Sequence, residues 1–155
     1  YRGVGEIFVF LFAGRGAVAG PAYVQTLELT RLALAVSVPI GVLVVAILIV
    51  NNLRDIPTDT LTGKKTLAVR MGARATQYEY GLMLAIAAGA PLLFYFVGWL
   101  NWSWILTLLA WPVFYRLWQT VTTQTGPALN PLLGKTGQAL LLYSVLLSAA
   151  LVISR

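Results

Sequence analysis

The sequence predicts an all-α protein, a bundle of helices that crosses a membrane several times. Apolar residues make up 59% of the chain and charged residues only 10%, against about 25% charged residues in soluble domains. The apolar residues gather in five stretches, and each is near the roughly 20 residues that a helix needs to cross the hydrocarbon of a bilayer. A long polar segment separates the second stretch from the third. These observations favour a multi-pass transmembrane helix bundle.

The five apolar stretches are expected to be helices, because a backbone in lipid must satisfy its own hydrogen bonds. They cover residues 5–25, 31–50, 79–99, 102–122 and 132–154. Glu6 and Arg15 interrupt the first, so tertiary contacts must cover these charges if it spans. The last opens with Asn130 and Pro131, typical of an N-cap followed by proline. The third contains small residues that suit close helix packing: Gly81, Ala85, Ala88 and Gly89.

The composition also excludes several kinds of site. The chain has no cysteine and no histidine, so disulfides, cysteine metal sites, histidine-ligated zinc and a serine–histidine triad are excluded. The net charge of +6 does not indicate a nucleic-acid partner, because the basic residues lie between apolar stretches and form no basic domain. The expected surroundings are membrane lipid.

Basic residues predict the orientation in the membrane. The N-terminus and the loops at 51–78 and 116–131 are expected at one end of the bundle, where most of the cations gather. These are Arg2, Arg54, Lys64, Lys65, Arg70, Arg74 and Arg116, with Lys135 early in the last helix. The positive-inside rule places this end in the cytoplasm of a bacterial-type cell, with a plastid membrane as the alternative. At the opposite end, Trp99, Trp102 and Trp104 are typical of an interfacial aromatic belt.

The polar segment from Asn51 to Gly72 is the candidate functional site. It contains Asp55 and Asp59, which on a helix would face the same way and could share one cation. Pro57 disfavours a helix at the residue before it, so we expect the second helix to end near Asp55 and a turn to bring Asp59 back. Magnesium typically uses one or two carboxylates together with phosphate oxygens. The segment therefore predicts a Mg²⁺–diphosphate site with both aspartates as ligands and catalytic residues.

Two amides and three cations are the candidate substrate-binding residues around these acids. They are Asn51, Asn52, Arg54, Lys64 and Arg70. The cations suit phosphate oxygens, and the amides suit phosphate or metal-bound water. Simpler interpretations stay open. Asn51 and Asn52 can be ordinary polar groups at the end of a helix. Asp55 can pair with Arg54 in a solvated loop, Lys64 can serve only to set topology, and Arg70 can meet lipid head groups.

The segment NNLRDIPTDTLTGKKTLAVRMG closely resembles the second aspartate-rich motif of the UbiA-type intramembrane prenyltransferases. The matching features are Asn51, Asn52, Arg54, Asp55, Asp59, Gly63, Lys64, Thr66 and the run from Leu67 to Arg70. Supporting similarity lies in YRGVGEIFVF (1–10), in residues 23–25 and in LNPLLGKTGQALLLY (129–143). Within the family, the residues of this segment are most similar to those of the 1,4-dihydroxy-2-naphthoate polyprenyltransferases of quinone biosynthesis.

The resemblance implies a fold and an activity. The family has about nine helices and a first aspartate motif of the form NDxxDxxxD, which is absent here. We therefore expect residues 1–155 to be the C-terminal portion, about five helices, of one prenyltransferase domain. Its missing partner is then the N-terminal half, and the chain alone is expected to be inactive. The implied activity is Mg²⁺-dependent transfer of a polyprenyl group from polyprenyl diphosphate to 1,4-dihydroxy-2-naphthoate, with decarboxylation.

Two alternatives stay open from the sequence. A related enzyme of the same family would use another aromatic acceptor. A transporter fragment would explain the helices and the intramembrane Arg15, but it would not explain why acids and bases gather in one loop.

Overall fold

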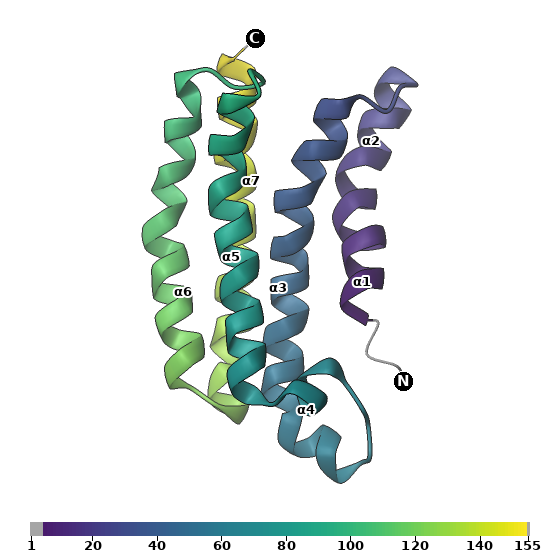
Figure 1. The fold of residues 1–155 in the computed structure, drawn as a ribbon, viewed down its shortest axis with the longest axis vertical. Coiled ribbons are helices and arrows are strands. Elements are labelled where there is room, and N and C mark those ends of the chain that lie inside the picture. Colours follow the sequence, from purple (N-terminus) through teal and green to yellow (C-terminus); the bar gives the residue numbers. More distant parts are fainter. Residues whose placement is uncertain (1–4, 155) are drawn as a thin grey trace.

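The computed structural model describes residues 5–154, without the side chains of Arg15 and Thr26 (Figure 1). The predicted roles of Arg2 and Arg15 therefore lie outside what is described. The elements are α1 (Gly5–Val9), a π-helical turn (Phe10–Arg15), α2 (Gly16–Thr26), α3 (Arg31–Leu61), α4 (Leu67–Met71), α5 (Ala73–Phe96), a 3-10 helix (Trp102–Ala110), α6 (Trp111–Thr123), a 3-10 turn (Gly126–Leu129) and α7 (Asn130–Ile153). The described part of the chain contains no strand, so the all-α prediction is confirmed.

Between residues 5 and 154, four helical segments are long and apolar enough to cross a membrane: Gly5–Gln25, Arg31–Leu61, Ala73–Phe96 and Gly126–Ile153. The predicted stretch at 102–122 is helical too, but it is divided between a 3-10 helix and α6. Large apolar side chains face outward, as a lipid environment requires; Phe12 is 74% exposed and Val24 is 75% exposed. These features are those of an integral multi-pass membrane protein.

Helix α3 is the central element. It packs against the α1–α2 segment on one side and against α5 and α7 on the other, and Leu43 and Ile49 on it are fully buried. Figure 1 shows α4 and the α6–α7 connection at the same end of the bundle, the end where α1 begins. The polar segment and the other predicted cytoplasmic loop therefore do lie together.

Glycines allow the closest helix contacts. A Cβ on Gly14 would overlap the backbone of Gly41 in α3, so the first segment and α3 touch through their backbones. In α5, a Cβ on Gly81 would meet the indole of Trp118 from α6, whereas one on Gly89 would find no atom within 4 Å. The prediction of close packing is thus confirmed at Gly81, while Gly89 borders open space.

Buried hydroxyl groups join α5 to α7. The hydroxyls of Tyr80 and Thr136 lie 2.9 Å apart, and the Tyr143 hydroxyl donates to the carbonyl oxygen of Ala87 at 2.7 Å. Such interhelical bonds hold helices together where no water is available. They keep α7 in place beside the end of α3, where the polar segment begins.

The predicted end of the second helix near Asp55 is wrong. Helix α3 runs through Pro57 to Leu61. Proline removes one helical donor, but threonine hydroxyls supply others: Thr58 donates to the carbonyl oxygen of Asp55 at 2.9 Å, and Thr60 donates to that of Ile56 at 2.7 Å. Both hydroxyls, which follow the proline, bond carbonyl groups of the two residues before it, and the helix continues.

Asn130 is not an N-cap. Leu129 occupies the N-cap position of α7 with helical backbone angles and no capping side chain, because the 3-10 turn runs directly into the helix. Asn130 is instead the first helical residue. Its side-chain oxygen accepts a hydrogen bond from Arg54 of α3, so the amide joins two helices.

Candidate functional site

The last three turns of α3 carry the candidate site. Because the helix is continuous, residues four apart lie on one side of it: Asn51, Asp55 and Asp59 form such a row. The side-chain amide of Asn51 donates to Oδ2 of Asp55 at 3.4 Å. The two aspartates therefore face the same way on the helix itself, without the turn that the sequence had led us to expect.

Asp55 is held by its neighbour Arg54. The guanidinium Nε lies 2.7 Å from Oδ1 of Asp55, and Nη2 lies 2.8 Å from Oδ2. This bidentate pair is the simpler interpretation that the sequence left open. A carboxylate accepts about four hydrogen bonds, so Oδ1, which accepts one, still has a free lone pair. Asp55 is thus both oriented by Arg54 and able to bind a cation.

Arg54 also links α3 to α7. Nη2 donates to the side-chain oxygen of Asn51 at 2.9 Å, and Nη1 donates to that of Asn130 at 3.0 Å. Four side-chain contacts to three residues fix the orientation of the guanidinium at the start of α7. The site is therefore built across two helices through residues that are 76 positions apart in the chain.

Asp59 has the clearest sign of a missing ligand. The residue is only 7% exposed, and its Oδ2 is buried with no hydrogen-bond partner among the described residues. Its Oδ1 lies 3.4 Å from Nζ of Lys64. An unsatisfied buried carboxylate oxygen is costly. A bound cation at this atom would remove that cost.

A glycine turn places Lys64 beside Asp59. After α3 ends, Gly63 has φ +71°, a left-handed conformation that suits glycine. The N–H of Gly63 donates to the carbonyl oxygen of Thr60 and the N–H of Lys64 to that of Asp59, which is the Schellman pattern of helix ends. The chain therefore folds back, and the backbone and side chain of Lys64 both meet Asp59.

Two predicted residues lie outside this cluster. The side-chain amide of Asn52 points to α1 and donates to Oε1 of Glu6 at 2.8 Å. Arg70, in the last turn of α4, is exposed and forms no ion pair with the described residues. The structure thus brings together Asn51, Arg54, Asp55, Asp59 and Lys64 from the predicted set.

An apolar hollow of about 440 Å³ adjoins the cluster. Asn51 forms its polar wall, and the other lining residues are Val9, Val44, Ile47, Leu48 and Leu133. These residues come from α1, α3 and α7. Because Asn51 also bonds to Asp55, the hollow begins where the charged groups end. An amphiphile with an anionic head group and a hydrocarbon tail fits such a site.

The donor set fits one magnesium ion. Two aspartates face the same way, one with an unsatisfied buried oxygen, and magnesium typically uses one or two carboxylates and completes its shell with water and phosphate oxygens. No group of three acidic, histidine or cysteine residues that could hold a metal occurs within the described residues. Asp55 and Asp59 are the described residues that would hold such an ion.

Two partners in the site were not found by sequence reasoning. Asn130 was interpreted as a cap and proved to accept a hydrogen bond from Arg54. Glu6 was expected to need a tertiary contact, and it proved to accept a hydrogen bond from Asn52. Both contacts join residues far apart in the chain. No local spacing signals them, although each residue is polar and borders an apolar stretch.

Comparisons with known proteins show which family the sequence resembles. The model of the UbiA prenyltransferase family matches residues 1–135. The chain is 37% identical over 155 residues to a 1,4-dihydroxy-2-naphthoate octaprenyltransferase of Mycobacterium leprae, covering 99% of this chain and 52% of that protein. Proteins of the same name from Mycobacterium tuberculosis and Escherichia coli are 39% and 32% identical, over 97% and 100% of this chain and 51% of each protein. The chain thus spans about half the length of these relatives. No solved structure matches it significantly.

Proposed function

The chain belongs to the UbiA prenyltransferase family, and from this premise we propose what the complete protein does. It transfers a polyprenyl group from polyprenyl diphosphate to 1,4-dihydroxy-2-naphthoate, and the acceptor loses its carboxylate as carbon dioxide. The observation that carries the proposal is the buried, unsatisfied Oδ2 of Asp59 beside Lys64. The choice of acceptor is supported by the names of the relatives. A transporter fragment does not account for the family match.

Asp55 and Asp59 hold Mg²⁺ in this proposal. When bound, the ion supplies Lewis-acid neutralisation of the diphosphate leaving group. Asp59 offers an oxygen that has no hydrogen bond to lose. Asp55 offers the remaining lone pair of Oδ1 while Arg54 keeps the carboxylate in position. The two acids therefore differ: the metal ion would satisfy the unpaired oxygen of Asp59, and Asp55 would be a second metal ligand whose orientation Arg54 fixes.

The cations around the acids bind the diphosphate. The side chain of Lys64 is 40% exposed. Its ammonium group can therefore contact an anion while it stays close to Asp59. Arg54 presents a guanidinium whose orientation Asn51 and Asn130 fix. As the C–O bond breaks, its electron pair leaves with the diphosphate, and these fixed positive charges stabilise it. Arg70 and Asn52 are proposed as further contacts to the outer phosphate.

The apolar hollow beside Asn51 takes the first part of the prenyl chain. Its lining of valine, leucine and isoleucine excludes water from the allylic carbon, and water would otherwise quench the cation that ionisation forms. The aromatic ring of the acceptor attacks that carbon instead. Asn51 lines the hollow and bonds to Asp55. The diphosphate group and the prenyl chain of the substrate would therefore join beside Asn51.

The test is made on the full-length enzyme with Asp55→Asn and Asp59→Asn. Each change keeps the size of the side chain and removes its charge. We expect turnover at limiting Mg²⁺ to fall by about a hundredfold or more, because losing a metal ligand forfeits several kcal/mol and each 1.36 kcal/mol is about tenfold in rate. Glu28→Gln, at the opposite end of the bundle, is the control and retains activity.

Transfer of a labelled prenyl group to 1,4-dihydroxy-2-naphthoate is the assay. Near-normal rates at limiting Mg²⁺ in both aspartate variants would show that these acids are not metal ligands. Competition between 1,4-dihydroxy-2-naphthoate and 4-hydroxybenzoate decides the acceptor. Preference for the second compound would overturn the naphthoate assignment while leaving prenyl transfer intact.

A further inference from the structure

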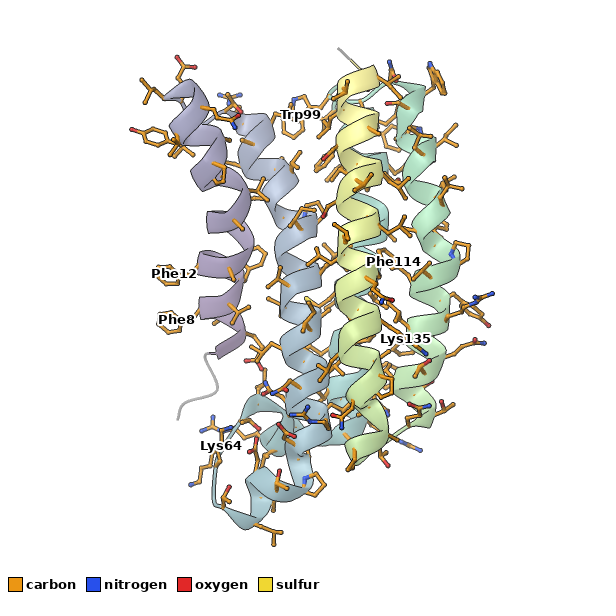
Figure 2. The ribbon with its side chains drawn as sticks, turned by 180° about the vertical axis from the view of Figure 1, so that it is seen from behind. Phe8, Phe12, Lys64, Trp99, Phe114 and Lys135 are labelled. Atoms are coloured by element: carbon orange, nitrogen blue, oxygen red, sulfur yellow. The ribbon has the colours of Figure 1, made fainter. Side chains whose placement is uncertain are left out.

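A second cavity, the α6–α7 groove, lies between α6 and α7, away from the aspartates. Its volume is about 470 Å³. Polar side chains line one part of it: Arg116 and Thr120 from α6, and Lys135 and Gln138 from α7. Apolar side chains, among them Val113 and Leu142, line another part. Figure 2 shows Lys135 between these two helices, in the lower half of the bundle.

This groove is separate from the candidate active site. On α7, Leu133 lines the hollow beside Asn51, while Lys135 lines the groove beside α6. Two residues along a helix turn the side chain by about 200°, so the two cavities lie on different faces of α7. A ligand in the groove therefore does not occupy the prenyl site.

The groove carries positive charge without a compensating acid. Arg116 and Lys135 are exposed, and neither forms an ion pair within the part of the chain that the structure describes. No aspartate or glutamate is among the lining residues. A diphosphate carried by magnesium needs carboxylates, whereas a single phosphate group can pair directly with arginine and lysine. The charges of the groove thus match a phosphate that arrives without a metal.

The polar and apolar parts of the groove are ordered along the bundle. Helix α6 runs towards the polar end of the molecule and passes Val113 before Arg116 and Thr120, while α7 runs away from it and passes Lys135 and Gln138 before Leu142. Leu117 and Ala139 lie among the polar residues, but the deepest lining residue on each helix, Val113 or Leu142, is apolar. From Lys135 to Leu142 the helix rises about 10 Å. This order is that of a lipid head group above its acyl chain.

We propose that the α6–α7 groove binds an anionic phospholipid. The phosphodiester pairs with Arg116 and Lys135, Thr120 and Gln138 offer hydrogen bonds to the head group, and an acyl chain lies along Val113 and Leu142. Basic pockets between transmembrane helices are suited to anionic lipid head groups. The lipid would join α6 to α7 at their polar ends, where the described residues provide no ion pair between the two helices.

Native mass spectrometry of the detergent-purified full-length enzyme tests this with added phosphatidylglycerol. The variant Arg116→Gln/Lys135→Gln is compared with Lys65→Gln/Arg74→Gln, which removes two other exposed cations from the same end. Each cation near a lipid head group contributes about fivefold in affinity. We expect about thirtyfold weaker lipid retention in the groove variant and unchanged retention in the control. The exchange Arg116→Lys/Lys135→Arg keeps both charges and should retain the lipid.

Several results would overturn the proposal. Equal retention by the two double glutamine variants would place the lipid elsewhere, and equal retention of phosphatidylcholine would exclude recognition of negative charge. No retention by the unchanged enzyme would mean that other parts of the protein cover the groove. Displacement of the lipid by inorganic phosphate or by polyprenyl diphosphate would identify a free-phosphate site or a second donor site. Asp59→Asn should retain phosphatidylglycerol, so failure of the proposed function leaves this inference standing.

Discussion

Replacing Gly81 by alanine should separate the packing of α5 on α6 from the intrinsic helix preference of the residue. The new Cβ would lie 2.8 Å from Cε3 and 3.2 Å from Cη2 of Trp118, both shorter than ordinary carbon contacts of about 3.5–4.0 Å. The indole packs against the core and its ring lies 6.1 Å from that of Tyr78, so turning it away would break these contacts. Either the indole or the helix must therefore shift.

The size of the effect follows from comparison with Gly89 on the same helix. A Cβ at Gly89 would meet no atom within 4 Å, so Gly89→Ala brings only the helix preference of alanine, about 1 kcal/mol. Gly81→Ala brings the same gain and adds the cost of overpacking, about 1–3 kcal/mol. Because the gain is common to both, the difference in unfolding free energy between the two variants, about 1–3 kcal/mol, measures the overpacking.

The assay is reversible denaturation of the full-length protein in mixed micelles, followed by circular dichroism. Gly81→Ala should be the less stable of the two variants. When both substitutions are made separately in a Trp118→Leu background, their stabilities should be equal. Equal stabilities of the two single variants would refute the close approach of α5 and α6 at this position. Persistence of the difference in the Trp118→Leu background would show that the indole is not its cause.

Two further predictions concern the arrangement of the protein in the membrane and the isolated chain. Thr60 lies in the last turn of α3 and Asn101 in the connection after α5, at opposite ends of the bundle in Figure 1, and both residues are exposed. Cysteines introduced at these two positions of the full-length protein should react from opposite sides of sealed vesicles, with position 60 on the cytoplasmic side. Reaction of both from one side would contradict this topology. Residues 1–155 alone should show no prenyl transfer in lipid. Among the described residues, Asp55 and Asp59 are the proposed ligands of one metal ion, and a second metal needs its own carboxylates. Transfer by the chain alone would contradict the half-enzyme interpretation.

The membrane helices could be predicted because lipid leaves the backbone few choices. Long apolar stretches must be helical there, and the predicted stretches agree with α3, α5 and α7 apart from their ends. The ends were less predictable, because they depend on side-chain hydrogen bonds. Pro57 suggested a break, but the hydroxyls of Thr58 and Thr60 bond neighbouring carbonyl groups and α3 continues. The actual end depends on Gly63, whose left-handed backbone closes the helix.

The residues of the candidate site could be predicted more fully than the contacts that join them to distant helices. Asp55, Asp59 and Lys64 lie within ten residues of one another, so any compact local structure brings them together. The contact of Arg54 with Asn130 depends instead on how α7 lies against α3, and that placement follows from core packing and from the buried bonds of Tyr80 and Tyr143. Long-range packing of this kind leaves no spacing in the sequence.

The pairing of Arg54 with Asp55 bears directly on the metal hypothesis. A bidentate arginine neutralises a carboxylate and would make it a poor metal ligand if it consumed every lone pair. Here Arg54 divides its donors among Asp55, Asn51 and Asn130, so Oδ1 of Asp55 accepts only one bond. Asp59 has the opposite character, a buried oxygen with no bond at all. A cation placed between the two acids would satisfy Asp59 without displacing Arg54, and the arginine would stay beside the diphosphate that the cation carries.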